Sequence, residues 1–154
     1  MAFLQWLESA PFSTWLKESP SLLAYPAVLF LHSLGLIFTA GPSVLVCMRL
    51  LGVGRGLPLA PLDRFFRVIW IGFWTSAASG LVMLAVDATT KLANPLFTAK
   101  MIFVIVSVAL MVLVRRVVAR GTAQAEPVRG RLLAAASLAC WVGAIAAGRF
   151  MAYF

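Results

Sequence analysis

The most constraining feature of this sequence is a run of thirty residues, 22–51, that carries no charge before Arg49. An α-helix needs about 20 predominantly apolar residues to cross the hydrocarbon core of a bilayer, so this run is long enough to span a membrane with some tilt. The chain of 154 residues is 62% hydrophobic and 12% charged, whereas soluble domains average about 25% charged residues. The sequence therefore predicts an integral membrane protein.

Three further apolar runs follow the first one. We expect four spans, at about residues 22–51, 66–86, 96–114 and 132–153. Residues 3–18 are amphipathic, rich in tryptophan and phenylalanine, and interrupted at Pro11, which predicts one or two short helices on the membrane surface. The predicted fold class is all-α. Residues 1–154 are expected to form one membrane domain, a bundle of four transmembrane helices with an N-terminal amphipathic interfacial helix.

The basic residues are distributed unevenly between the two ends of the expected bundle. Nine of the thirteen lysines and arginines fall in or beside the first and third connecting loops. Cytoplasmic loops of membrane proteins carry an excess of Lys and Arg. We therefore expect these two loops in the cytoplasm of a bacterium, and both termini on the periplasmic side of its inner membrane. Because these loops account for most of the formal charge of +8, the charge does not indicate nucleic-acid binding.

His32, the only histidine of the chain, lies inside the first span. An ionisable side chain at that depth is costly unless it has a partner, and it indicates a functional site. Lys100 and Arg149 lie in the outer halves of the third and fourth spans, so we expect all three side chains to face one cavity. This pattern suits haem b, with His32 as the iron ligand and Lys100 and Arg149 pairing with the propionates. Gly35, one helical turn beyond His32, leaves room for a flat macrocycle or for another helix.

Other interpretations of these residues stay open. A haem held by two histidines cannot form within a chain that has one. The iron would therefore be five-coordinate, or its sixth ligand would be a methionine such as Met83 or Met101, or a side chain of a partner. In the alternative interpretation, His32 binds no cofactor and forms a hydrogen bond inside the helix bundle. Lys100 and Arg149 lie close enough to the ends of their spans to extend toward lipid headgroups.

The usual motifs of enzymes are absent from the sequence, which has no Ser/His/Asp set, no HExxH and no Walker loop. We expect a protein that is not an enzyme on its own. The main hypothesis is a redox subunit or anchor that binds haem b and exchanges electrons with a periplasmic partner. The alternative is a non-catalytic scaffold or assembly subunit that contacts other subunits, or a second copy, through the small residues of 76–80 and 139–148. A metal or solute permease is a third class.

Four segments carry a resemblance to known proteins: WLESAPFSTWLKES, LHSLGL followed by RLLG, VDATTKLANPLFTAKM and AAGRFMAY. They resemble an uncharacterised family of small bacterial four-helix membrane proteins, a domain of unknown function. A first-span histidine followed by small residues and Arg-Leu, with a lysine at the start of a later span, is also distantly similar to CopD copper-resistance proteins and HemJ-type protoporphyrinogen oxidases. The HemJ-type resemblance implies a haem ligand at His32 and a functional lysine at Lys100. At the end of the third span, where such proteins often have a histidine, this chain has Val114-Arg115-Arg116.

Overall fold

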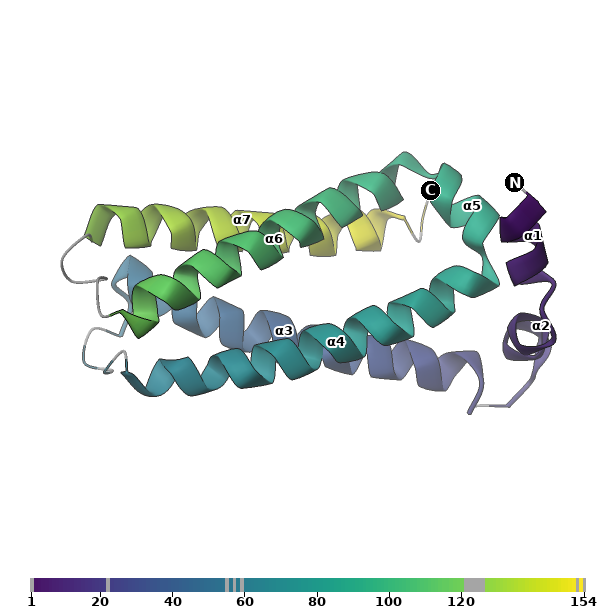
Figure 1. The fold of residues 1–154 in the computed structure, drawn as a ribbon, viewed down its shortest axis with the longest axis horizontal. Coiled ribbons are helices and arrows are strands. Elements are labelled where there is room, and N and C mark those ends of the chain that lie inside the picture. Colours follow the sequence, from purple (N-terminus) through teal and green to yellow (C-terminus); the bar gives the residue numbers. More distant parts are fainter. Residues whose placement is uncertain are drawn as a thin grey trace.

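The computed structural model describes residues 2–21, 23–54, 56, 58, 60–120, 127–151 and 153. Within these residues the chain is helical and contains no strand. The helices, in chain order, are α1 (Ala2–Glu8), α2 (Pro11–Glu18), α3 (Tyr25–Leu51), the short 3₁₀ helix η1 (Ala60–Leu62), α4 (Asp63–Val86), α5 (Ala88–Ala93), α6 (Pro95–Ala119) and α7 (Pro127–Phe150). Figure 1 shows α3, α4, α6 and α7 running along the long axis of the molecule.

These four long helices confirm the predicted fold class. Each is long and apolar enough to cross a membrane, and the 27 residues of α3 extend about 40 Å, which exceeds the roughly 30 Å of a hydrocarbon core. Two short helices, α1 and α2, occupy the predicted amphipathic segment and meet at the break before Pro11. The predicted all-α membrane bundle is therefore the observed one.

Some helices extend beyond the expected spans because a helix can continue past the apolar residues that define a span, whereas α3 begins at Tyr25, three residues inside the expected start. Helix α4 begins three residues before the expected span, and α6 continues through Arg115 and Arg116. Arginine is a good helix former, and its side chain can reach water from within a helix. The expected second loop also contains α5, and α6 begins immediately after it with Pro95 as its first residue. The side chain of Asn94 accepts a hydrogen bond from the Leu96 N–H at 2.9 Å.

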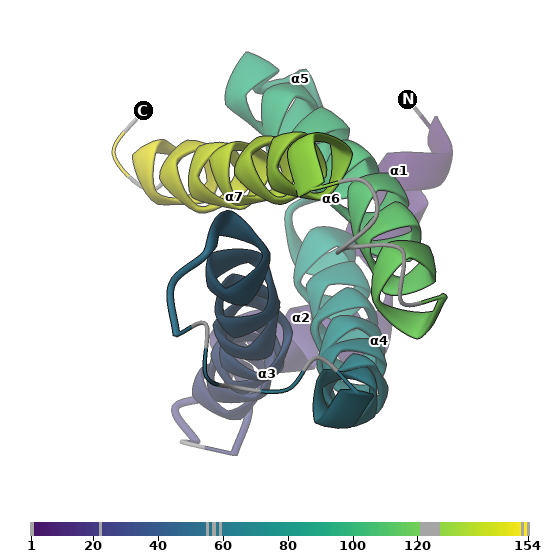
Figure 2. The same cartoon turned by 90° about the vertical axis from the view of Figure 1, so that its left-hand side faces the viewer.

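The bundle consists of two helical pairs. Helix α3 packs most extensively on α4, and α6 packs on α7, while α3 also contacts α7. Helices α4 and α6 touch at few positions. Seen along the bundle in Figure 2, α7 lies across the end of α3, and α4 and α6 stand beside each other. The weak contact between α4 and α6 leaves one side of the bundle less tightly closed than the others.

Small residues allow α3 and α4 to approach each other very closely. A Cβ atom placed on Gly35 would lie 2.6 Å from the Ser76 backbone nitrogen and 2.8 Å from the Gly72 carbonyl oxygen. A Cβ atom on Gly72 would in turn lie 2.8 Å from the Gly35 carbonyl oxygen. Helices in membranes associate through such small-residue contacts because lipid supplies no hydrophobic drive for their packing. Gly35 and Gly72 therefore set the distance between the two backbones.

The amphipathic helices α1 and α2 are attached to one end of the bundle, beside α5 (Figure 1). Leu16 of α2 is buried against Ala24 and Val86. Lys17 donates to Asp87 Oδ1 at 2.8 Å, and the Glu8 carboxylate accepts from both the backbone N–H and the hydroxyl of Thr89, at 2.7 and 2.8 Å. Polar contacts to α5 and its flanks thus hold the surface helices in place, together with one apolar anchor.

We predict that Gly35→Ala destabilises the protein by about 3 kcal/mol, because its Cβ atom would collide with backbone atoms that cannot move aside. Gly130→Ala is the matched control, since the nearest atom to its Cβ would be 3.9 Å away and alanine favours the helix by about 1 kcal/mol. Thermal denaturation in detergent measures both. Equal melting temperatures for the two variants would contradict the close contact between α3 and α4.

We also predict that acid weakens the attachment of α1 to α5. The hydrogen bonds from Thr89 lower the pKa of the Glu8 carboxyl, so its stabilising effect is present above the ordinary pKa of a glutamate and is lost as pH falls through the lowered folded-state pKa. Glu8→Gln should therefore increase hydrogen exchange of the α5 backbone at pH 7 and have no effect at a pH where Glu8 is protonated. Glu18→Gln is the control, and an equal effect of that substitution would refute the prediction.

Candidate functional site

A pocket of about 410 Å³ lies among all four long helices. Its walls are almost entirely apolar, and its polar groups come from His32 and Thr39 of α3, Ser76 of α4 and Lys100 of α6. Leu81 of α4 and Met101 of α6 line the pocket while remaining 67% and 37% exposed. The pocket therefore opens sideways between α4 and α6, where the two helical pairs are least tightly joined. Its volume is within the range of small-molecule and cofactor sites.

The imidazole of His32 is held by α4 through one of its two nitrogens. Nδ1 lies 2.9 Å from the Ser76 carbonyl oxygen and 3.3 Å from each of the Ser76 and Ser79 hydroxyls. Because a carbonyl oxygen can only accept, Nδ1 carries the hydrogen and donates it. In the described part of the chain, Nε2 has no hydrogen-bond partner. Metal-binding histidines have the same arrangement: one ring nitrogen donates its hydrogen to a carbonyl oxygen, and the other keeps a free lone pair for the metal.

Gly80 makes room for the imidazole on the α4 side. A Cβ atom at Gly80 would lie 3.1 Å from Cε1 and 3.4 Å from Nδ1 of His32. A side chain at this position would push the ring away from its carbonyl partner. Gly80 was predicted only as part of a small-residue patch for helix packing. Its spacing of four residues from Ser76 is the signal that places it one turn along the same face of α4.

Among the described residues, Lys100 is the one lysine or arginine that lines the pocket. Its aliphatic part passes over Gly148 of α7, where a Cβ atom would lie 3.4 Å from Cε and 3.6 Å from Nζ. The described residues provide no carboxylate within 4 Å of this ammonium group. An ammonium group without a counterion beside an apolar cavity is a place where an anionic group of a ligand would be stabilised.

Trp141 of α7 closes the inner wall of the pocket and is buried. Its indole Nε1–H is buried with no hydrogen-bond partner among the described residues. A buried donor without a partner costs about 1–3 kcal/mol. The sequence pattern that places Trp141 inside the bundle is its spacing from Ser137 and Ala144, which are also buried and lie on the same face of α7.

The structure brings together two of the four residues predicted to bind the cofactor. His32 and Lys100 both line the pocket, and Met101, one of the two suggested sixth ligands, lines it with them. Gly35 does not line it, because α4 occupies the space beside this glycine. Arg149 does not line it either; it is exposed, with its guanidinium 5.9 Å from the centre of the Tyr153 ring.

Several of the small residues suggested as contacts for other subunits face the inside of the bundle. Ser76 and Ser79 of α4 are buried against α3. Gly143 of α7 lies against the Phe103 ring of α6, at 2.9 Å from a hypothetical Cβ atom, and Gly148 lies against Lys100. These four small residues therefore serve packing within the chain, whereas Ala78 and Ala139 of the same two patches are exposed.

The fold and the pocket define a membrane-embedded four-helix bundle with a laterally open, mostly apolar site built around one histidine and one lysine. The chain belongs to DUF6644, a family of unknown function, whose model matches residues 4–154. This confirms the expected membership of an uncharacterised family. No curated protein and no solved structure matches the chain significantly, and none of the comparisons shows similarity to CopD or HemJ-type proteins.

We predict that the neutral imidazole of His32 is the tautomer protonated on Nδ1, because its closest partner is a carbonyl oxygen at 2.9 Å. Since the chain has a single histidine, ¹⁵N-histidine labelling gives one pair of ring nitrogen signals. Nuclear magnetic resonance of the cofactor-free protein at mildly alkaline pH should show a protonated Nδ1 and an unprotonated Nε2. A proton on Nε2 would refute the geometry, and Ser33→Ala, whose hydroxyl bonds to Leu29, should leave the signals unchanged.

Proposed function

We propose that this protein is a small membrane redox subunit that binds haem b in the pocket between its four long helices. The observation that carries the proposal is that His32, with Nδ1 held by a carbonyl oxygen, and Lys100 line one mostly apolar cavity. A haem needs an imidazole lone pair for its iron, apolar walls for its macrocycle and cations for its propionates. A bound haem would supply one-electron redox chemistry.

The residues around the His32 imidazole are arranged as expected for residues that hold an iron ligand in position. The Ser76 carbonyl accepts from Nδ1 and keeps the lone pair on Nε2. Gly80 provides the space in which the ring lies against α4. Among the described residues, no group of three His, Cys, Asp or Glu side chains is placed to hold a metal ion. The proposal therefore concerns a metal whose other ligands belong to the cofactor.

Lys100 and Met101, which also line the pocket, have proposed roles in binding the haem. Lys100 would pair with a propionate, since this residue lines the pocket and its ammonium group has no carboxylate partner among the described residues. Met101, which lines the same pocket, is the candidate sixth ligand in place of Met83.

The orientation of the protein follows from its charges. The arginine-bearing ends of α3, α4, α6 and α7 lie at the end of the bundle opposite α1, α2 and α5 (Figure 1). By the positive-inside rule this end faces the cytoplasm of a bacterial inner membrane, and both termini face the periplasm. His32 is seven residues, or about 10 Å, inside the start of α3. The site would thus lie nearer the periplasmic surface, where an electron-transfer partner would bind.

The test is an optical spectrum of the full chain, purified in detergent after expression with ample haem. We predict a Soret band that sharpens on reduction with dithionite and is absent from His32→Gly. Because this substitution could also disturb folding, imidazole is then added to the variant. Recovery of the band shows that the empty ligand position alone caused its loss.

Three further variants sharpen the result. Met101→Ala should shift the reduced spectrum, whereas Met83→Ala, outside the pocket, should not. Lys100→Met should weaken haem binding about tenfold, in line with the value of a charge-assisted bond, and Lys17→Met should have no effect. A colourless native protein that co-purifies with a stable partner would refute haem binding and support the scaffold hypothesis.

A further inference from the structure

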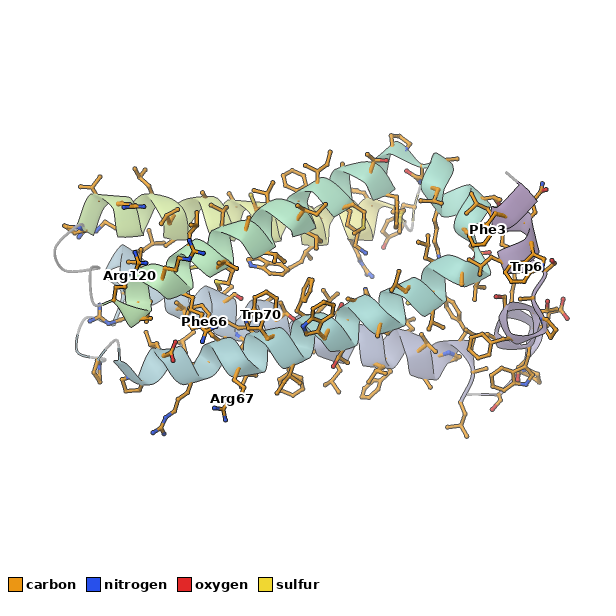
Figure 3. The ribbon with its side chains drawn as sticks, in the orientation of Figure 1. Phe3, Trp6, Phe66, Arg67, Trp70 and Arg120 are labelled. Carbon is orange, nitrogen blue, oxygen red and sulfur yellow. The ribbon has the colours of Figure 1, made fainter. Side chains whose placement is uncertain are left out.

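A second cavity of about 640 Å³ lies at the arginine-rich end of the bundle, on the surface of α4 and α6. Its lining combines arginines with aromatic and apolar side chains. We call it the basic groove and define it by Arg64, Arg67, Trp70, Ile71, Trp74 and Arg115. Figure 3 shows Arg67 and Trp70 on the same helix, with Arg67 extending away from the bundle. The basic groove shares no residue with the His32 pocket.

The basic groove has an excess of positive charge. Asp63 is the one carboxylate among its described lining residues, and a carboxylate oxygen of Asp63 lies 3.6 Å from Nε of Arg115. Both are about half exposed, so their pairing is weak. In the described part of the chain, no carboxylate lies within 4 Å of Arg64 or Arg67. Two guanidinium groups therefore remain available to an anion.

Polar and apolar groups are arranged in sequence along α4. Arg64, Arg67, Ile71 and Trp74 are spaced three, four and three residues apart, so they form one stripe on the helix. The stripe extends about 15 Å from first to last. Ile71 and Trp74 are 61% and 65% exposed. The arginines thus lie near the end of the span, and the exposed apolar side chains lie deeper, at the level of lipid acyl chains.

The third arginine approaches from α6. The guanidinium of Arg115 lies 6.0 Å from the centre of the Phe66 ring, and Phe66 is 1% exposed. A cation close to an aromatic ring is held there by the ring quadrupole. Arg115 is therefore positioned beside Arg64 and Arg67 by a buried side chain, while its contact with Asp63 is weak enough to be exchanged for another anion.

We propose that the basic groove binds an anionic phospholipid of the surrounding bilayer. Its phosphate would lie among Arg64, Arg67 and Arg115, and an acyl chain would follow Trp70, Ile71 and Trp74. Guanidinium groups bind phosphate oxygens in pairs of parallel hydrogen bonds. Basic pockets between transmembrane helices on the cytoplasmic side are suited to anionic headgroups. The basic groove therefore provides positive charge for the lipid phosphate and exposed apolar side chains for the acyl chain.

The test measures lipid binding to the purified full chain by native mass spectrometry, with phosphatidylglycerol and phosphatidylcholine of identical acyl chains. The native protein should prefer phosphatidylglycerol. Arg64→Gln combined with Arg67→Gln should reduce this preference about tenfold or more, in line with charge-assisted bonds to phosphate. Arg116→Gln combined with Arg120→Gln removes the same charge from the same end of the bundle, outside the groove, and should preserve the preference.

Two additional experiments distinguish the phosphate of a lipid from free phosphate. Inorganic phosphate should displace phosphatidylglycerol poorly, and Trp74→Ala should weaken its binding without changing the net charge. No preference in the native protein, or an equal loss in both arginine pairs, would overturn the proposal. Efficient displacement by inorganic phosphate, with no effect of Trp74→Ala, would overturn the lipid as the ligand and indicate a site for free anions.

Discussion

The close contact between α3 and α4 is the constraint on which the rest of the structure depends. Gly35 and Gly72 bring the two backbones together so closely that a Cβ atom on either would lie within 2.8 Å of the other helix. This proximity places the Ser76 carbonyl within hydrogen-bond distance of His32. A polar ring inside a membrane bundle must have such a partner, because neither lipid nor apolar side chains can supply one. The helix contact and the orientation of the imidazole are therefore one arrangement.

The packing of α6 and α7 against α3 and α4 determines where the pocket is open to the lipid. Helix α6 packs on α7 and only weakly on α4, so the two pairs enclose a pocket and leave it accessible from the side. Lys100 reaches this pocket from α6, and His32 reaches it from α3. A site of this kind joins a polar inner part to an apolar opening at the depth of the lipid tails. This makes it suited to a ligand that is mostly apolar and carries an anionic group.

Charge and aromatic residues differ between the two ends of the bundle. At one end, α1 and α2 are attached through Glu8, Lys17 and Leu16 to α5 and its neighbours. At the other end, arginines extend from α4 and α6 over exposed tryptophan and isoleucine side chains. The first end uses its charges for contacts within the chain. At the second end, Arg64 and Arg67 have no carboxylate partner among the described residues. Their guanidinium groups are therefore available to anions outside the chain.

Local properties of the sequence were enough to predict the four spans and the amphipathic N-terminal helices, and to select His32 and Lys100, which both line the pocket. Length, hydropathy and the cost of a buried charge do not depend on how helices pack. The side of each helix that faces the pocket could not be predicted, because the spans are apolar around most of their circumference and show little periodicity. Tertiary structure alone decided that Gly35 meets α4, that Arg149 lies outside the pocket, and that Met101 lines it while Met83 does not. These outcomes depend on helix rotation, which is determined by contacts between residues far apart in the sequence.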